Sequence, residues 1–332
     1  MTSATRDVPR VSIVIPARDA VRWLPETLAS ALAQTHVTTE IIVVDDGSTD
    51  GTADLAAGYG DRVRVIRQPP SGVSAARNAG TSAARGEFIQ YLDADDVLED
   101  GTVAARVTLL DRTGADVALT DYARWQKQAD GTFKVERIMR HRLGDRPDVQ
   151  LLTYAWWPPG AMLYRRTIVD RIGPWRADLR IIQDARFQLD AALVGARFAQ
   201  IEEVGLRYRM HGATSTSLSR RDPLAFVNEC FESASELHDR WQADGTLDEP
   251  RRDGLLRVYH YVARSVFKAD RARYAEVTAR IDELAPRFVP DGPAWLRQLS
   301  RLFGYRAAEH ITHWLRQVRT VSGLPTPKPG EW

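Results

Sequence analysis

At residues 87–96 the sequence reads EFIQYLDADD, an apolar run that ends on three carboxylates. We expect a buried strand over residues 87–92, because strands covered on both faces are nearly continuous apolar runs. Residues two apart in an extended chain point to the same side, so Asp93 and Asp95 can face one ligand. Hard cations such as Mg²⁺ commonly bind one or two carboxylates together with substrate phosphates. The stretch therefore predicts a divalent-cation site at a strand end, with a solvated acidic loop as the alternative.

Two upstream loops favour the cation site. Residues 40–44, EIIVV, indicate a second buried strand and are followed by the turn-forming sequence DDGSTDGT. Residues 11–16, VSIVIP, indicate a third, and we expect the chain to leave the sheet at Pro16, because proline cannot donate to a central ladder. Open α/β sheets bind ligands beyond the carboxyl ends of their strands. Three such loops in succession predict one site.

The first half of the chain alternates expected strands and helices. Strands are expected at residues 11–15, 41–44, 63–66, 87–92 and 117–120, and helices at residues 24–34, 52–58, 72–84 and 102–111. This order predicts an α/β fold with a doubly wound, mostly parallel sheet flanked by helices. Further along, we expect a hairpin around Asp130-Gly131, strands at residues 161–164 and 204–210, and a helix at residues 183–193.

After Asp222 the pattern predicts helices and no strands. The expected helices span residues 225–241, 255–267, 274–284 and 295–318. We therefore expect an α/β domain over residues 1–221 and an α-helical C-terminal region over residues 222–332.

Composition narrows the class of protein. The chain has 332 residues, is 44% apolar and carries a formal net charge of +1, which gives no general electrostatic basis for binding nucleic acid. Its single cysteine, Cys230, excludes an internal disulfide and a cysteine-based zinc site, and is expected to be a packed helix residue. The first ten residues do not resemble a signal peptide, and no run approaches the ~20 apolar residues that span a bilayer. We expect a cytoplasmic protein.

Six short motifs occur in an order and spacing that carry a family resemblance. They are VSIVIP at 11–16, EIIVVDDGSTD at 40–50, AARNAG at 75–80, YLDADD at 91–96, QD at 183–184 and YRMH at 208–211. Together they resemble the inverting nucleotide-sugar glycosyltransferases of family 2, which have the GT-A fold. The resemblance implies metal-dependent sugar transfer to an acceptor hydroxyl in glycan, polysaccharide or glycoconjugate synthesis. It also implies a nucleotide-sugar half at residues 1–121 and an acceptor half at residues 122–221.

The resemblance implies a donor site built from the first loops. Asp45 would accept a hydrogen bond from the base, which suits the N3–H donor of uracil, so a UDP-linked sugar is expected; Asp46 would order the turn. Arg77 would bind diphosphate oxygens in bidentate fashion. The remaining donor-site residues that the resemblance implies are Pro16, Ala17, Asp19, Asp93, Ala94 and Asp95. Asp19 departs from the family, which usually has asparagine there.

The implied cofactor is Mg²⁺ or Mn²⁺, bound to the diphosphate. The resemblance makes Asp95 the residue that coordinates it directly. Asp93 would contact the ribose hydroxyls or a metal-bound water, or join the coordination. His211 would lie near the metal or diphosphate, with a purely structural role as the alternative.

On the acceptor side, the resemblance implies that Asp184 is the general base. A carboxylate there can take the acceptor hydroxyl proton as the oxygen attacks the anomeric carbon; a helix-start residue favoured by the macrodipole is the alternative. Gln183 stands where the family usually has glutamate and could hydrogen-bond a sugar. Trp156 and Trp157 could stack on sugar rings or pack in the core.

Two other functions are consistent with parts of the sequence. A sugar-1-phosphate nucleotidyltransferase can share this sheet and acidic site, but normally has a glycine-rich basic loop after the first strand, and residues 15–19, IPARD, do not supply one. A degenerate domain that binds nucleotide or glycan without transfer is suggested by Asp19 and Gln183.

The acceptor itself is open. It could be a saccharide, a lipid-linked glycan or another hydroxyl compound. The segment at residues 295–318 combines arginines with apolar side chains, so it could lie on the inner face of an anionic membrane. Packing on its own domain or forming a homo-oligomer are the alternatives.

Overall fold

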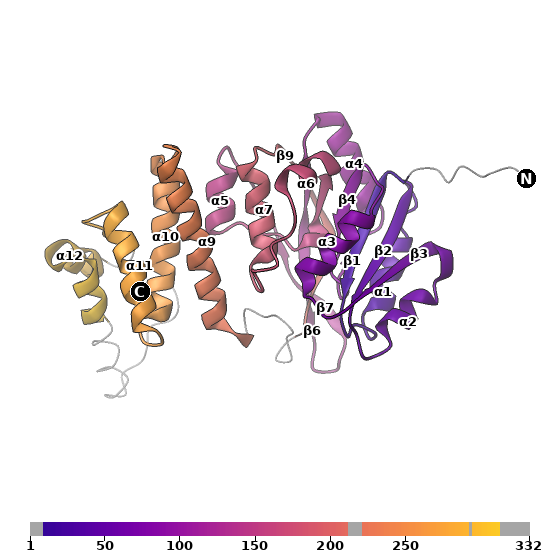
Figure 1. The fold of residues 1–332 in the computed structure, drawn as a ribbon, viewed down its shortest axis with the longest axis horizontal. Helices are drawn as coiled ribbons and strands as arrows, with labels where there is room; N and C mark the ends of the chain where they lie inside the picture. The colour runs from indigo at the N-terminus through magenta and orange to yellow at the C-terminus, as the bar shows by residue number, and fades with distance from the viewer. Residues whose placement is uncertain (1–8, 212–220, 292–293, 313–332) are drawn as a thin grey trace, which may run out of the picture. The chain divides into compact units, whose positions relative to one another are not determined.

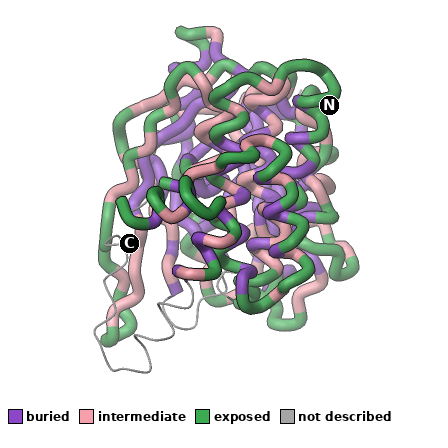
Figure 2. The backbone as a smooth tube through the Cα atoms, turned by 90° about the vertical axis from the view of Figure 1, so that its left-hand side faces the viewer, coloured by how far each residue is buried: buried purple, intermediate pink, exposed green. Residues whose placement is uncertain are grey.

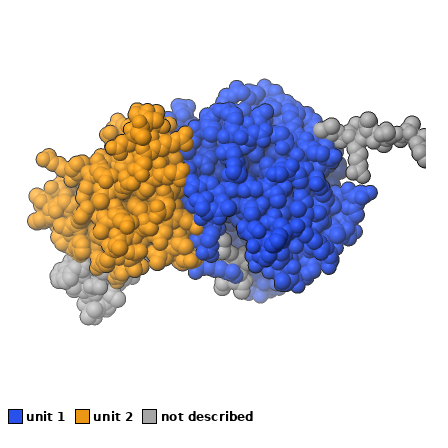
Figure 3. Space-filling model, in the orientation of Figure 1, with its two compact units in different colours: residues 1–221 blue, residues 222–332 orange. Residues whose placement is uncertain are grey.

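The computed structural model describes residues 9–211, 221–291 and 294–312 (Figure 1). It divides into two compact units, residues 1–221 and 222–332, which are coloured separately in Figure 3. The first unit holds a sheet with helices, and the second holds helices.

Four parallel strands form the first half of the sheet, in the order β3-β2-β1-β4. Their bounds are β1 Val11–Ala17, β2 Thr39–Asp46, β3 Val63–Gln68 and β4 Phe88–Tyr91, and the helices along this part are α1 Leu24–Leu32, α2 Thr52–Ala57, α3 Val73–Ala83 and α4 Thr102–Thr113. All seven residues of β1 are buried, as a strand covered on both faces should be. Figure 2 shows buried residues mostly in the interior and exposed residues mostly along the outside of the tube. The expected mostly parallel α/β sheet is confirmed.

The rest of the sheet mixes directions. Its strands are β8 Met162–Arg165, β6 Val117–Lys127, β9 Phe198–Met210 and β5 Val97–Leu98, which follow β4 in that order, with β7 Phe133–Met139 paired to β6. The β6–β7 pairing confirms the hairpin expected around Asp130-Gly131. Because β8 is antiparallel to both β4 and β6, and β9 is parallel to β6, the ends of β4 and β9 lie at the same edge of the sheet.

Strand β9 begins six residues earlier than the sequence pattern predicts. Ile201 pairs with Thr120, and the next paired residue is Val204, opposite Asp121. Glu202 and Glu203 therefore form an irregularity in the ladder. Because these two residues are charged and exposed, the sequence pattern did not indicate that one strand continues on both sides of them. Among the described residues of this unit, the further α-helices are α5 Pro147–Thr153 and α6 Arg166–Ile172, which the sequence did not predict, and α7 Gln183–Leu193, which it did.

The expectation that the chain leaves the sheet at Pro16 is wrong. Strand β1 continues to Ala17, and Pro16 pairs in register with Val44. The carbonyl of Val14 accepts a hydrogen bond from Leu92 on the β4 side, so Pro16, two residues later, turns its nitrogen to that same side. Pairing with β4 has already ended at Val14, so the missing N–H removes no ladder bond.

Glycine at position 80 lets α3 lie directly against the sheet. A Cβ built on Gly80 would fall 2.3 Å from Val14 Cγ1 and 3.2 Å from Val44 Cγ2. The absence of a side chain at Gly80 therefore permits the close approach of α3 to β1 and β2. Position 80 thereby sets the distance between the helix that carries Arg77 and the two strands beneath it.

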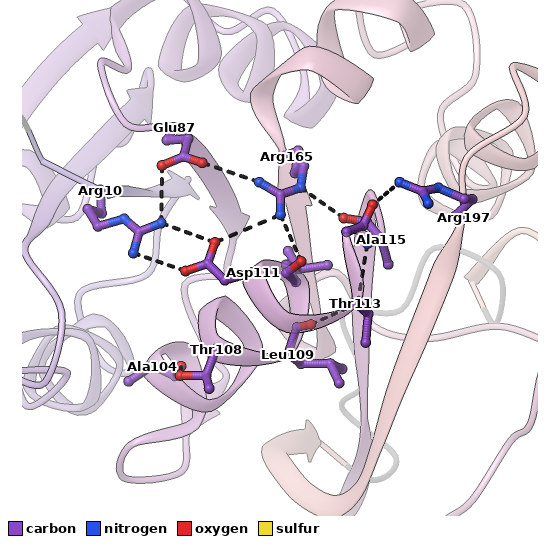
Figure 4. Close-up of polar contacts among 12 residues, drawn as sticks. Arg10, Glu87, Ala104, Thr108, Leu109, Asp111, Thr113, Ala115, Arg165 and Arg197 are labelled. Atoms are coloured by element: carbon purple, nitrogen blue, oxygen red, sulfur yellow. Dashed lines mark hydrogen bonds and ion pairs between the residues drawn. The ribbon is translucent and has the colours of Figure 1, made fainter.

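An ionic network ties the amino-terminal edge of the sheet together (Figure 4). Arg10 contacts Asp111 at 3.1 Å and Glu87 at 3.2 Å, and Arg165 reaches the other oxygen of Glu87 at 3.2 Å. The guanidinium groups of Arg10 and Arg165 also lie 5.3 and 5.0 Å from the ring centroid of Phe88. Since most of these groups are partly exposed, each pair alone contributes little. The network joins the starts of β1 and β4 to the end of α4, at the edge opposite the polar loops.

The second unit consists of helices in the part of the chain that is described: α9 Pro223–Ala243, α10 Glu249–Val266, α11 Arg271–Leu284 and α12 Ala294–Phe303. Asp222, Asp248 and Asp270 each accept a backbone N–H three residues on, so the first three helices begin earlier than the apolar pattern predicts. The single helix expected at residues 295–318 is wrong in its length, because α12 ends at Phe303 before Gly304, whose φ is +81°. Residues 313–318 lie outside the described residues. Burial raises the pKa of the Cys230 thiol to about 12, as suits a packed helix residue.

Gly80→Ala is expected to destabilise the first unit. Overpacking costs about 1–3 kcal/mol, and the better helix propensity of alanine offsets about 1 kcal/mol of that. Thermal unfolding should show a lower Tm for this variant than for Gly144→Ala, whose added Cβ would meet its nearest atom, on the Gln150 side chain, at 3.6 Å. Equal Tm values for the two variants would show that α3 can shift freely on the sheet.

Candidate active site

The loops after β1 and β2 form the first part of the site. Ala17 pairs in register with Asp45, so the residues expected to bind the base are neighbours. Asp45 is 4% exposed; its Oδ2 accepts a hydrogen bond from the backbone of Ser48 at 3.4 Å, and its buried Oδ1 has no partner among the described residues. Buried polar atoms are rarely left without a partner. The carboxylate therefore offers one oxygen to a ligand.

Two further aspartates join loops at this edge. Both oxygens of Asp46 accept hydrogen bonds, from Gln68, Ser71 and Gly72 at 2.7–2.9 Å, so Asp46 links the end of β2 to the loop after β3, and its ordering of its own turn stays a prediction. Asp19 has a φ of 47°, a conformation that aspartate and asparagine tolerate better than most residues. Its Oδ1 accepts from the backbone of Thr49 at 2.8 Å, so Asp19 links the loop after β1 to the loop after β2.

Arg77 on α3 is a buried cation within the site. Its side chain is 2% exposed, Nη2 donates to Asp93 Oδ1 at 2.7 Å, and the guanidinium lies 4.3 Å from the ring centroid of Trp175. Asn78 fixes Trp175 from the same helix by exchanging two hydrogen bonds with its backbone, at 2.8 and 2.9 Å. Nε and Nη1 of Arg77 have no partner among the described residues. Arg77 can therefore bind an anion in addition to Asp93.

Asp95 and His211 meet across the sheet edge, with Nε2 of the histidine 2.7 Å from Oδ2 of the aspartate. Carboxylate and neutral imidazole are both ligands for Mn²⁺, and a carboxylate suits Mg²⁺. Among the described residues no group of three or more His, Cys, Asp or Glu side chains comes together to hold a metal. The residues present fit a cation that takes its remaining ligands from a diphosphate and water.

Asp184 lies in the first turn of α7 and is held from two sides. The indole N–H of Trp156 donates to Oδ2 at 3.1 Å, and the backbone N–H of Ala185 donates to Oδ1 at 2.7 Å. Burial raises the pKa of Asp184 to about 6, against the opposing charge of Arg77 and with a further increase from Asp93. A carboxylate with this pKa is largely ionised at pH 7 and is a better proton acceptor than an ordinary aspartate.

Four carboxylates share this edge of the sheet. Burial raises the pKa of the Tyr208 hydroxyl, and the charges of Asp96, Asp184, Asp93 and Asp95 raise it further, which places all four around one tyrosine. Burial also raises the pKa of Asp96 well above its usual range, with Asp95 and Asp93 adding to the effect. The arrangement concentrates negative charge where a cation and a cationic side chain can bind.

The residues expected to contact the acceptor differ in their burial and in their contacts. Trp156 is partly buried and contacts Tyr208 and Tyr122, with ring centroids 5.7 and 6.2 Å apart. Trp157 is fully buried, and its backbone exchanges hydrogen bonds with Gln188, so its ring is a core residue and does not offer a face to an acceptor. Gln183 is 8% exposed, and its Oε1 has no partner among the described residues.

The sequence motifs did not identify three contributors to this arrangement. Trp175 supports Arg77, Tyr208 lies among the carboxylates, and Arg209 contacts the Asp95 loop. Tyr208 and Arg209 occur within the motif YRMH and Trp175 lies outside the quoted motifs, and the directions of all three side chains depend on how distant segments pack. Ala94, in contrast, is 8% exposed, and its carbonyl accepts a hydrogen bond from Thr27.

Known proteins resemble the chain at both the sequence and the structural level. The family model described as glycosyl transferase family 2 matches residues 12–173. An uncharacterized glycosyltransferase of Rickettsia prowazekii (strain Madrid E) is 36% identical over 254 residues, 75% of each chain. The uncharacterized glycosyltransferase EpsJ of Bacillus subtilis (strain 168) is 27% identical over 225 residues, and the match spans 64% of that protein, just under two thirds.

Two solved structures show the same fold. S. aureus TarS 1-349 in complex with UDP-GlcNAc superposes with a TM-score of 0.64 at 18% identity, over 96% of this chain and 93% of that one. The mannosyltransferase PcManGT from Pyrobaculum calidifontis, in complex with GDP-Man and Mn²⁺, gives a TM-score of 0.51 at 16% identity, over 91% and 86%. At these identities the likeness concerns the fold alone, and it confirms the expected GT-A type.

Asp184→Asn is expected to stabilise the protein at pH 8. The folded-state pKa of about 6 exceeds the ordinary 3.8, so ionising Asp184 costs stability as pH rises from about 4 to 6, and the cost is complete above that range. Removing the charge should raise the stability by about 1 kcal/mol after allowance for partial exposure, or about 2–4 °C in Tm. The difference should shrink at pH 5.

A variant on the same helix should behave in the opposite way. Asp190 pairs with the buried Arg186 at 2.8 Å, so Asp190→Asn is expected to lower the Tm. A fall in Tm at pH 8 for Asp184→Asn as well would contradict the raised pKa.

Proposed function

We propose, because this chain belongs to glycosyltransferase family 2, that it moves a sugar from a UDP-linked donor to an acceptor hydroxyl with inversion at the anomeric carbon. The observation that carries the proposal is the position of Asp184. A partly desolvated carboxylate with a raised pKa lies within the field of the Arg77–Asp93 pair, so a base and an anion-binding cation occupy one site.

The donor is proposed to bind along the loops after β1, β2 and β4. The free Oδ1 of Asp45 can accept the N3–H of uracil, beside Pro16 and Ala17, and Asp19 keeps the two loops together. The two unpartnered nitrogens of Arg77 can bind diphosphate oxygens, for which a guanidinium is suited. TarS binds UDP-GlcNAc in its solved structure, which supports a UDP-linked donor for a chain of the same fold.

A divalent cation is proposed at Asp95 and His211, and Asp93 is proposed to hold a bound water or the ribose. When bound, Mg²⁺ or Mn²⁺ stabilises the negative charge that develops on the leaving diphosphate. PcManGT is in complex with GDP-Man and Mn²⁺, which supports a divalent cation bound together with the donor in this fold. Asp95 and His211 approach to 2.7 Å, so they can bind one ion together.

Asp184 is proposed to act as the general base. Its carboxylate takes the proton of the acceptor hydroxyl while the hydroxyl oxygen forms a bond to the anomeric carbon, and the bond from that carbon to the diphosphate breaks on the opposite face. The indole of Trp156 holds Oδ2, which fixes the direction of the carboxylate. General-base catalysis contributes typically ~10²–10⁴-fold.

The environment of Asp184 argues against a degenerate binding module. A module that only binds nucleotide has no use for a carboxylate whose ionisation costs stability, whereas stability is commonly given up at sites that perform chemistry. The nucleotidyltransferase alternative is also disfavoured, because β1 leads into Pro16, Ala17 and Asp19 rather than a glycine-rich basic loop.

The acceptor is proposed to bind beside Trp156, with Gln183 able to hydrogen-bond a sugar. None of the described helices combines the length and hydrophobicity needed to cross a membrane. Leu302 and Phe303 on α12 are 67% and 62% exposed, near Arg301. This supports contact of the C-terminal helices with a lipid-linked acceptor at a membrane surface, or with a second copy of the chain.

Asp184→Asn should abolish transfer while leaving donor binding intact. Release of UDP from a panel of UDP-sugars, with water or a saccharide as acceptor, should fall ~10²–10⁴-fold in the variant. In the unsubstituted protein, kcat/KM should rise with pH through about 6, because only the ionised carboxylate accepts the proton. The control is Asp190→Asn on the same helix, which should retain activity. Full activity of Asp184→Asn would remove this residue from the mechanism.

A further inference from the structure

Arg209, near the end of β9, lies in a cage of three aromatic rings. Its guanidinium carbon is 4.5 Å from the ring centroid of Trp125 and 4.7 Å from those of Trp23 and Phe133. The side chain is 1% exposed. Trp23 directly precedes α1, and Trp125 and Phe133 belong to the β6–β7 hairpin, so three segments distant in sequence meet around one cation.

Hydrogen bonds join this caged arginine to the loop that carries Asp95. Nε of Arg209 donates to the backbone oxygen of Asp95 at 2.6 Å, and its backbone N–H donates to Asp96 Oδ1 at 2.9 Å. On the same loop, Thr27 of α1 donates to the backbone oxygen of Ala94 at 3.0 Å. The backbone from Ala94 to Asp96 is therefore fixed by α1 and β9 together.

His211, two residues after Arg209, contacts two of the residues that Arg209 contacts. The ring of His211 lies 5.0 Å from that of Trp23, one of the rings of the cage, and its Nε2 is 2.7 Å from Asp95 Oδ2. We propose that Arg209 is a positioning residue that presets Asp95 and His211 as a two-ligand site for a divalent cation bound with a nucleoside diphosphate. The proposal rests on the proposed function.

Charge balance explains how a cationic side chain can lie beside a cation site. Nη2 of Arg209 donates to Glu26 Oε2 at 2.6 Å, so a carboxylate on α1 neutralises it. The aromatic faces attract the guanidinium and keep it from turning toward a bound diphosphate. A lysine at this position could keep the charge but could not make the forked contacts to Asp95 and Glu26.

Arg209→Lys tests the proposal through cation affinity. With UDP present, Mn²⁺ should bind the variant about tenfold to hundredfold more weakly, as measured from free Mn²⁺ by electron paramagnetic resonance, because outer contacts of this kind typically set metal affinity to that extent. UDP binding without a metal should change little. A residue that merely stabilises the fold would not separate these two affinities.

Arg106→Lys is the matched control. Arg106 is fully buried in the same unit, where it donates to Gln90, Gly160 and Thr120 at 2.6–2.9 Å and contacts none of the proposed site residues. This variant should have a lower Tm and an unchanged Mn²⁺ affinity. Equal Mn²⁺ affinities for Arg209→Lys and Arg106→Lys would overturn the positioning role.

Glu26→Gln covers the case in which Arg209→Lys does not fold. The Glu26 side chain is 49% exposed, so the substitution should lower the Tm by less than Arg209→Lys does, while weakening Mn²⁺ binding in the same direction, by a smaller factor. Unchanged Mn²⁺ binding in Glu26→Gln would then count against the proposal. If the unsubstituted protein binds UDP but no Mn²⁺, the proposed cation site fails and the positioning role fails with it.

Discussion

Four carboxylates, those of Asp93, Asp95, Asp96 and Asp184, share one edge of the sheet. The cost of burying such groups together, first by loss of hydration and then by repulsion between them, is the constraint on which the site depends. Two buried arginines offset the negative charge: Arg77 pairs with Asp93, and Arg209 donates a hydrogen bond to the backbone of Asp95. The guanidinium of Arg77 lies against one aromatic ring and that of Arg209 against three, and such contacts allow a cation to be buried while its N–H groups remain directed at the loops. The fold around the site is therefore organised by cations and rings from distant segments.

The two edges of the sheet differ in how completely their charged side chains are paired. At the amino-terminal edge, Arg10 and Arg165 pair with Glu87 in a partly exposed network that joins the strand starts (Figure 4). At the carboxyl edge, the carboxylate of Asp184 keeps a raised pKa and Asp45 keeps an unpartnered oxygen. The first edge satisfies its charges within the protein, and the second leaves part of its bonding capacity for a ligand.

The sequence predicted those features that depend on neighbouring residues in the chain. Continuous apolar runs identified the buried strands, and the polar loops after β2 and β4 identified the site edge. The course of β1 through Pro16 depends on where β4 stops pairing, and the length of β9 depends on an irregularity at Glu202, so neither could be read from its own segment. Likewise, the burial of Trp157 and the cage around Arg209 depend on contacts between segments far apart in sequence.

The central claim is that the loops after β1, β2 and β4 bind a nucleoside diphosphate with a divalent cation. Calorimetry with UDP, GDP, TDP, CDP and ADP, each with and without Mn²⁺, tests it most directly, in the unsubstituted protein and in Asp95→Ala. The account predicts tight binding of one diphosphate, with UDP expected, and a dependence on Mn²⁺ that is lost in Asp95→Ala. Binding that is unaffected by Mn²⁺ in both proteins, or no binding of any diphosphate, would contradict it.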